Sequence, residues 1–165
     1  SAAQRTMPDV FIGIGSNADP VRALREAVTA LERLHPVLRS SSVYCSPAIG
    51  VAAADYLNMV VSIGTAVDVD TLCAELAALE LAAGRSRVDR TVCRLDLDVL
   101  LYGQRVDAPR RLPRPGVLEQ LFVLGPLAEI APALEHPLTG VRYGSAWSAV
   151  NSATLTKLGA LAALG

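Results

Sequence analysis

The stretch RLDLDVLL, residues 94–101, constrains the possible folds of this chain more than any other part of the sequence. Its apolar residues alternate with acidic ones, and a period of two residues is typical of a β-strand with one buried face. Asp96 and Asp98 therefore share one face, roughly 6.5–7 Å apart at about 3.3 Å of rise per residue. Such a carboxylate pair could hold one or two hard cations, or could be the solvated face of an edge strand. The opposite, apolar face carries Leu95, Leu97 and Val99.

Three further segments, in addition to the aspartate strand at 94–102, are typical of β-strands because they are short, apolar and bounded by turn residues. They are residues 9–17, residues 38–46 and residues 56–67. The first of them ends in Gly-Ser-Asn, which is turn chemistry.

Helical periodicity marks two longer segments. The first covers residues 20–34, and we expect Asp19 to cap it, with proline at its first position. The second runs from about residue 71 to 83, with Asp70 as the expected cap and Gly84 as the terminator.

Helices are also expected beyond the aspartate strand, over most of residues 117–130 and in the tail from about Ser145. The order is therefore β-α-β-β-α-β followed by helices, which is the order of a split βαβ motif. We predict an α+β fold with a ferredoxin-like antiparallel sheet as its core.

Length and composition narrow the class of protein. A chain of 165 residues can bury one core, and we expect a single domain spanning 1–165, with residues 1–6 as a disordered lead. A net charge of −1 argues against nucleic acid as a partner. No apolar run could span a bilayer, no secretory leader is evident, and no obligate protein partner is indicated. The three cysteines and two histidines show no metal-ligand spacing, so a reduced, cytoplasmic setting is expected.

Three features indicate phosphate chemistry. A Gly-Ser-Asn turn follows the first strand, residues 85–94 carry four arginines, and two aspartates lie on the next strand. Transfer of a polyphosphate needs carboxylates that hold Mg²⁺ and guanidinium groups that neutralise the moving charge. A P-loop enzyme is excluded because the sequence has no GxxxxGK[ST] motif.

The chain resembles the 6-hydroxymethyl-7,8-dihydropterin pyrophosphokinase family of folate biosynthesis nearly end to end. The matching segments, in order, are IGIGSN, SSVYCSPAIG, ADYLNMVVSI, LELAAGRSR, LDLDVLLYG and LFVLGPLAEIAP. Enzymes of this family move pyrophosphate from ATP to a pterin alcohol and release AMP. The resemblance implies a three-layer α/β/α fold with a ferredoxin-like core, ATP as co-substrate, two Mg²⁺ ions as cofactors, and small-molecule pterin and ATP as partners.

The resemblance also implies roles for individual residues. Asp96 and Asp98 match the family's magnesium ligands. On the pterin side, an amide can pair with the donor–acceptor edge of the ring and an aromatic side chain can stack on it; the matching residues are Gly15, Ser46, Pro47, Ile49, Tyr56, Asn58 and Phe122. On the ATP side the candidates are Glu80, Arg87, Arg110, Arg111 and Arg114. The candidate catalytic residues are Arg85 and Arg94.

Pattern alone leaves ordinary structural interpretations open for several of these residues. Phe122 lies in the apolar run LFVL, which is typical of a core. Tyr56 and Asn58 could face solvent on one side of their strand, and Glu80 could be an exposed helix residue. The joint match favours the functional roles.

Three positions depart from the family pattern, and all three lie on the nucleotide side. An arginine is expected three residues before the first magnesium aspartate, where this chain has Cys93. A histidine and a further arginine are expected where this chain has Arg114 and Gln120. The pterin side is unaltered.

We predict that Arg94 replaces the arginine missing at position 93. A strand that begins at or before residue 94 would place Arg94 on the face of Asp96 and Asp98, with Cys93 on the apolar face.

The departures define the competing hypotheses. The first is an active pyrophosphokinase with a rearranged set of arginines. The alternatives are a pterin-binding paralogue with weak or no transfer activity, and a phosphotransferase acting on a related substrate. The nucleotide product distinguishes them, because pyrophosphoryl transfer releases AMP, single phosphoryl transfer releases ADP, and a binding protein releases neither.

Overall fold

The computed structural model describes residues 7–47, 54–84 and 91–165 of the chain. The strands in this part are β1 (Asp9–Ser16), β2 (Val37–Ser40), β3 (Val43–Ser46), β4 (Tyr56–Gly64), β5 (Asp96–Tyr102) and β6 (Thr156–Gly159). The α-helices are α2 (Pro20–Leu34), α3 (Val69–Ala82), α4 (Leu121–Ile130) and α5 (Tyr143–Ala149). Two short 3₁₀ helices are η1 (Ala108–Arg110) and η2 (Leu161–Ala163).

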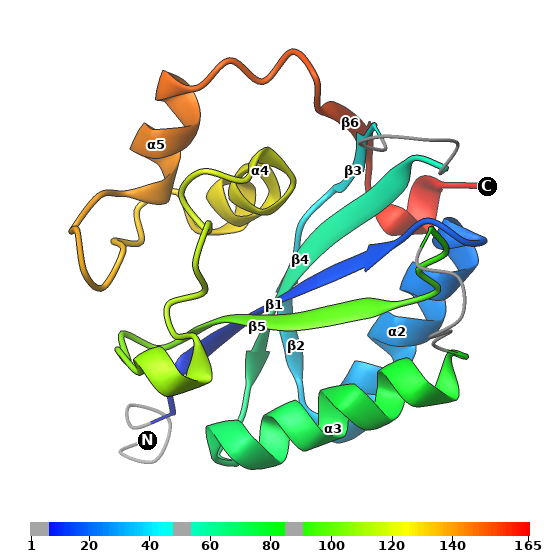
Figure 1. The fold of residues 1–165 in the computed structure, drawn as a ribbon, viewed down its shortest axis with the longest axis horizontal. Helices are drawn as coiled ribbons and strands as arrows, with labels where there is room; N and C mark the ends of the chain where they lie inside the picture. Colours follow the sequence, from blue (N-terminus) through cyan, green and yellow to red (C-terminus); the bar gives the residue numbers. More distant parts are fainter. Residues whose placement is uncertain (1–6, 48–53, 85–90) are drawn as a thin grey trace.

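The strands form one six-stranded sheet in the order β5-β1-β4-β3-β6, with β2 pairing with β4 outside this path. Every pairing is antiparallel. Strand β1 lies between β4 and β5, so the aspartate strand is an edge strand next to the first strand of the chain (Figure 1).

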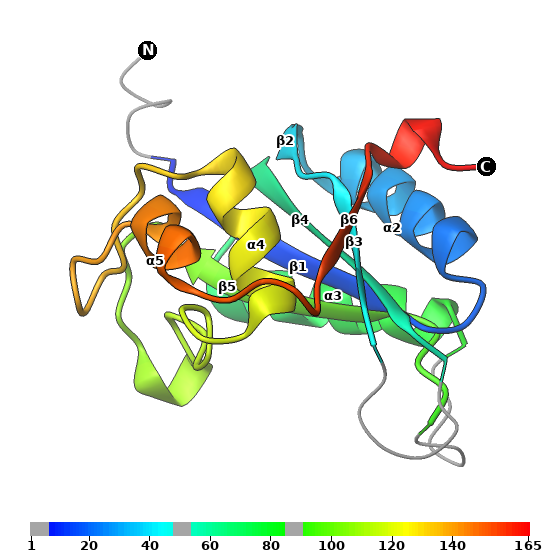
Figure 2. The same ribbon diagram turned by 90° about the horizontal axis from the view of Figure 1, so that it is seen from above.

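Helices cover both faces of the sheet, as Figures 1 and 2 show: α2 and α3 lie on one face, α4 and α5 on the other. The core under α2 and α3 takes alternate residues of β1 and β5, among them Ile12, Ile14, Leu97 and Val99. The core under α4 and α5 takes the other face, among them Phe11, Leu100, Leu124 and Tyr143. The predicted α+β fold with an antiparallel sheet in three layers is confirmed.

The segment 38–46 is two strands rather than the one predicted. Ser41 interrupts it, because the Ser41 hydroxyl accepts a hydrogen bond from Val60 N–H at 2.9 Å while Ser41 N–H donates to Val60 O, also at 2.9 Å. The hydroxyl and the N–H of this buried serine are therefore both hydrogen-bonded to β4, and the regular strand pairing is interrupted between β2 and β3. The strand predicted over 56–67 ends earlier, at Gly64.

The two predicted helices exist, but their caps differ from the expectation. Asp68, not Asp70, caps α3, because its Oδ1 accepts a hydrogen bond from Thr71 N–H at 2.8 Å. Asp19 stands before Pro20 in the left-handed region (φ 46°) and its side chain makes no capping hydrogen bond. Gly84 follows α3 with φ +88°, where a side chain would be strained, so its place as terminator agrees with the prediction.

The tail differs most from the sequence prediction. The helix α5 ends at Ala149, and the chain then returns to the sheet as β6, which pairs with the edge of β3. The four residues of β6 are largely exposed and show no alternation, so the sequence offers no strand pattern there.

Candidate active site

A cavity of about 660 Å³ opens between the sheet and the start of α4. Its volume lies in the range of small-molecule pockets, and its wall combines a few polar groups with a larger apolar surface. Strands β1, β3, β4 and β5, helix α4 and the segment before β6 all contribute to it. The lining residues are Gly15, Ser46, Pro47, Tyr56, Asn58, Asp96, Leu121, Phe122, Thr154 and Leu155.

The cavity therefore brings together most of the residues assigned to the pterin side. Asn58 is buried, and its Nδ2 donates to the Ser46 hydroxyl at 3.0 Å, which fixes the orientation of the amide. A Cβ on Gly15 would lie 2.8 Å from Asn58 Oδ1, so only glycine leaves room for this amide. Phe122 is 38% exposed at the first turn of α4, so its ring borders the cavity instead of filling the core.

Tyr56 stands at the edge of the cavity with its hydroxyl beside the Cys93 thiol. Burial raises the pKa of Tyr56 to about 12, with smaller contributions from Cys93 and Asp96. The phenol is therefore neutral at physiological pH and can act as a hydrogen-bond donor.

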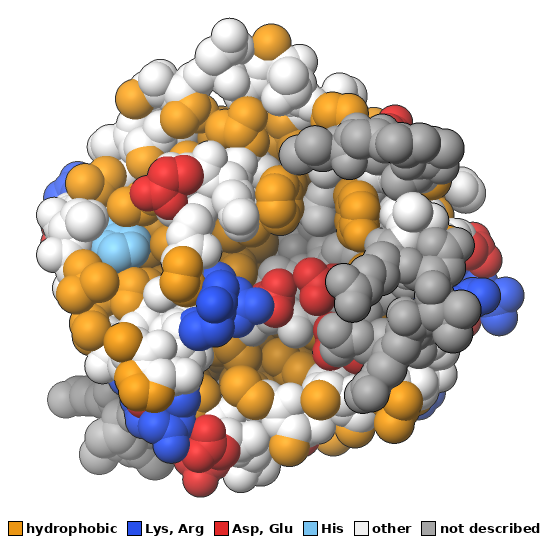
Figure 3. Space-filling view, viewed as in Figure 1, with side chains coloured by type: hydrophobic (Ala, Val, Ile, Leu, Met, Phe, Trp, Pro, Cys, Tyr) orange, Lys and Arg blue, Asp and Glu red, His pale blue; other side chains and the backbone are white. Residues whose placement is uncertain are grey.

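The two aspartates lie on the face of β5 opposite to Leu97 and Val99, as the alternation predicts. Asp96 is exposed on the wall of the cavity. Its pKa is nevertheless raised to about 7, first by partial burial of the carboxylate and then by the negative charges of Asp98 and Glu80. Asp98 forms an ion pair with Arg114. The Arg114 guanidinium offsets a small part of the rise in the pKa of Asp96. Figure 3 shows acidic side chains adjoining a basic one at a hollow on this face, with hydrophobic side chains on either side.

Glu80 is buried under β5 and is not the exposed helix residue that its pattern alone allowed. Its Oε2 accepts a hydrogen bond from Leu97 N–H at 3.0 Å, so α3 holds the edge strand at the point between the two aspartates. The carboxylates of Asp98 and Glu80 therefore both act on Asp96.

The donor set at this point fits a divalent cation. Carboxylate oxygens are the ligands that Mg²⁺ prefers, and a cation would relieve the repulsion that raises the pKa of Asp96. Over residues 7–47, 54–84 and 91–165, no group of three or more His, Cys, Asp or Glu side chains is placed to hold a metal ion. An ion held by Asp96 and Asp98 would therefore take its other ligands from water and from substrate phosphates, as protein-bound Mg²⁺ usually does.

The turn after β1 holds the chain that leads into β5. Asn17 is buried, and its Nδ2 donates to Thr91 O at 2.7 Å while its Oδ1 accepts from Cys93 N–H at 2.6 Å. Asn17 N–H also donates to Cys93 O at 2.9 Å. Both backbone groups of Cys93 are thus bound to the turn.

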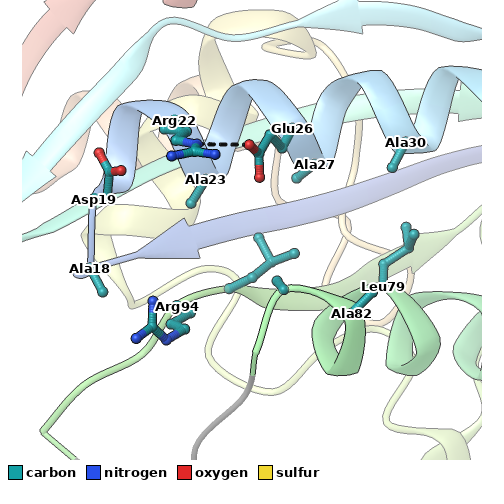
Figure 4. Close-up of a pocket in the computed structure, with 12 residues that line it drawn as sticks. Ala18, Asp19, Arg22, Ala23, Glu26, Ala27, Ala30, Leu79, Ala82 and Arg94 are labelled. Atoms are coloured by element: carbon teal, nitrogen blue, oxygen red, sulfur yellow. Dashed lines mark hydrogen bonds and ion pairs between the residues drawn. The ribbon is translucent and has the colours of Figure 1, made fainter.

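The prediction for Arg94 is wrong as to its position. Strand β5 begins at Asp96 and not at or before residue 94, so Arg94 lies outside the strand although it is exposed and Leu95 is buried. The Arg94 side chain lies in a separate cleft between α2 and α3, near Ala18 and Ala82 (Figure 4). Cys93 also differs from the expectation, because its thiol is beside Tyr56 rather than on the apolar face.

The arginines predicted on the ATP side differ in whether they reach the two aspartates. Arg110 binds both carboxylate oxygens of Asp70 at 2.9 Å and also pairs with Asp107 at 3.2 Å. Arg111 lines another cavity, together with His136, so neither reaches the pocket wall formed by Asp96. Arg114 alone of the three is paired with one of the two aspartates. Ile49, Arg85 and Arg87 lie outside the described residues.

Sequence reasoning missed three contributors to the cavity: Leu121, Thr154 and Leu155. Leu121 directly precedes Phe122 and could have been found as its neighbour at the helix start. Thr154 and Leu155 follow the last matching segment and carry no motif, so no signal in the sequence identifies them.

The fold and site define a small antiparallel α+β protein in which a pocket lined by aromatic and amide side chains adjoins two carboxylates and an arginine. The family model described as 7,8-dihydro-6-hydroxymethylpterin-pyrophosphokinase (HPPK) matches residues 11–132, and the chain belongs to this family. Its members are pyrophosphokinases of folate biosynthesis, which are ATP-dependent diphosphotransferases. Among the described residues, every helix is too short or too polar to span a bilayer.

Individual relatives agree with the family assignment. The 2-amino-4-hydroxy-6-hydroxymethyldihydropteridine pyrophosphokinase of Synechocystis sp. is 38% identical over 135 residues, covering 78% of this chain and 69% of that protein. The enzyme of the same name from Pseudomonas aeruginosa is 37% identical over 135 residues, covering 78% of this chain and 83% of that protein.

The fold also matches a solved structure. The crystal structure of wild-type Plasmodium falciparum HPPK-DHPS superposes with a TM-score of 0.66 over 87% of this chain, at 9% identity. This chain covers 44% of that protein, and at such low identity the likeness concerns the fold alone.

Proposed function

We propose that this protein transfers pyrophosphate from Mg²⁺-bound ATP to the hydroxymethyl group of 6-hydroxymethyl-7,8-dihydropterin and releases AMP. The observation that carries the proposal is that Asp96 lines the same cavity as Tyr56, Asn58 and Phe122. A ring held in this cavity presents its substituent to the carboxylates, where a phosphate chain would be bound.

Each wall of the cavity has a task in this reaction. Phe122 and Tyr56 offer aromatic surfaces for the pterin ring, and the Asn58 amide, fixed by Ser46, offers hydrogen bonds to its polar edge. Arg114 supplies positive charge beside Asp98, where charge on the transferred group has to be neutralised.

The reaction is a displacement at the β-phosphorus of ATP. The pterin hydroxyl oxygen forms a bond to this phosphorus, and the bond from it to the oxygen that bridges the α- and β-phosphates breaks. AMP leaves, and the hydroxyl proton passes to solvent. Asp96 and Asp98 would hold Mg²⁺, which when bound neutralises phosphate charge.

The pterin-binding paralogue without transfer activity is not favoured, because the similar proteins are named pyrophosphokinases. The decisive experiment incubates the protein with the dihydropterin alcohol and Mg-ATP and separates the nucleotides by chromatography. AMP formation supports the proposal. ADP formation, or no turnover, would overturn it.

Substitutions at the carboxylates test the site itself. Asp96→Asn and Asp98→Asn should each lower the rate of AMP release by about 10²-fold or more, because each removes a charge that holds the metal. Asp9→Asn is the matched control, since Asp9 is exposed at the far end of the neighbouring strand β1. Equal rates for the control and either site variant would remove that aspartate from the metal site.

A further inference from the structure

Residues 150–159, here called the C-terminal strap, complete the wall of the cavity. The strap leaves α5, passes α4 and joins the sheet as β6 beside β3 (Figure 2). On the way, Thr154 and Leu155 line the cavity together with Phe122. The strap lies beyond residue 132, where the match to the family model ends.

Contacts of its C-terminal half hold the strap in place. In β6, Tyr44 pairs with Lys157 and Cys45 with Thr156. Lys157 Nζ lies 3.6 Å from Glu129 Oε2 on α4, and the Glu129 carboxylate also accepts a hydrogen bond from the Tyr44 hydroxyl at 2.8 Å. The strap is therefore tied both to the sheet and to the helix that carries Phe122.

Leu155 lines two cavities. It lines the 660 Å³ cavity on one side and, on the other, a cavity of about 410 Å³ bordered by Gly125, Trp147 and Lys157. A Cβ on Gly125 would lie 3.0 Å from Leu155 Cδ2 and 3.0 Å from a ring carbon of Trp147. Leu155 thus fits closely against α4, and glycine at position 125 is what allows this approach.

We infer that Leu155 is a binding residue for the ring substrate, and this inference rests on the proposed function. Its side chain closes the apolar wall of the pocket. Shortening it removes side-chain atoms from the wall that faces the ring, so the ring loses packing contacts. Nucleotide binding depends on the carboxylates and Arg114, so it does not change.

Calorimetry with 6-hydroxymethylpterin as the probe tests the inference. Leu155→Ala should weaken pterin binding about tenfold or more, and Leu155→Val by a smaller factor in the same direction. Affinity for a non-hydrolysable ATP analogue should change less than twofold in both. Leu158→Ala is the matched control, because Leu158 lies on the same strap, is 41% exposed and does not line the cavity. Fluorescence of Trp147, the single tryptophan, reports whether each variant is folded.

The outcomes separate the inference from the proposed function. Graded loss of pterin affinity with unchanged nucleotide affinity supports the inference. Unchanged pterin affinity in both Leu155 variants would overturn the inference and leave the proposed function standing. Parallel loss of pterin and nucleotide affinity would also overturn it, because it would show a general structural role. If the unaltered protein bound no pterin, the proposed function and the inference would fall together.

Discussion

Replacing Asn17 by alanine should destabilise the protein far more than removing an ordinary surface asparagine. The Asn17 amide donates to Thr91 O at 2.7 Å and accepts from Cys93 N–H at 2.6 Å, and the residue is only 7% exposed. The substitution removes both hydrogen bonds and leaves both backbone groups without these partners.

The magnitude follows from where the two groups lie. Thr91 is exposed, so water can replace the amide at its carbonyl at a cost of about 1 kcal/mol. Cys93 is half-buried, and an N–H that loses its partner there costs about 2 kcal/mol. The expected loss in free energy of unfolding is about 3 kcal/mol, or a fall of roughly 6–12 °C in Tm for a domain of this size.

Urea unfolding followed by circular dichroism measures the loss directly. Asn151→Ala is the matched control, because Asn151 is exposed and its Oδ1 accepts one hydrogen bond from Ala153 N–H at 3.1 Å. It should cost less than about 0.5 kcal/mol. Asn17→Asp should lose about as much as Asn17→Ala near neutral pH, since a carboxylate oxygen would face Thr91 O. Equal losses for Asn17→Ala and Asn151→Ala would refute the reasoning.

Two further predictions concern a histidine and an arginine. Burial lowers the pKa of His136 below its usual 6.5, and its Nδ1 accepts hydrogen bonds from Leu138 and Thr139 N–H. The stability that neutral His136 contributes is therefore present above about pH 6.5 and lost as pH falls. The free energy of unfolding should drop between pH 7.5 and 5.5 more steeply in the unaltered protein than in His136→Asn. Parallel curves for the two proteins would contradict this. Arg94→Ala should change the rate of AMP release less than about threefold, whereas Arg114→Ala should lower it by about 10²-fold, because of these two arginines only Arg114 is paired with an aspartate of the site. Steady-state kinetics measure both rates, and the reverse order would refute the assignment.

The sequence could predict those elements in which buried residues repeat at a single regular spacing over a long segment. The alternation in β5 and the spacing of Leu24, Ala27 and Leu31 in α2 each follow from burial of one face against the sheet. The split between β2 and β3 could not be predicted, because it depends on Ser41 bonding to a strand that is distant in the sequence. The strand β6 was missed for the same reason, since its pairing with β3 alone makes it a strand.

In the candidate site, too, some residues could be predicted from the sequence and others could not. Asn58, Tyr56 and Phe122 came from motifs in the resemblance, and the structure brings all three to one cavity. Leu155 reaches that cavity only because the strap folds back across α4, and such a contact leaves no local pattern. Arg110 carries the charge expected of a nucleotide ligand, but Asp70 and Asp107 already bind it, which sequence spacing does not reveal.

The start of β5 explains why the charge beside the carboxylates does not come from Arg94. Asn17 binds the N–H and the carbonyl of Cys93, so these groups pair with a turn and not with the sheet. The hydrogen-bonded strand begins only at Asp96, after this turn has set the direction of the chain, although Leu95 is already buried in the same core as Leu97 and Val99. The Cys93 thiol then faces Tyr56, and the Arg94 guanidinium goes to the cleft between α2 and α3. Among the described residues, the guanidinium paired with the acidic site is that of Arg114, which comes from the loop after η1 and not from the strand. The charge balance of the site therefore depends on how that loop packs against β5, where Arg114 N–H donates to Leu100 O at 2.9 Å.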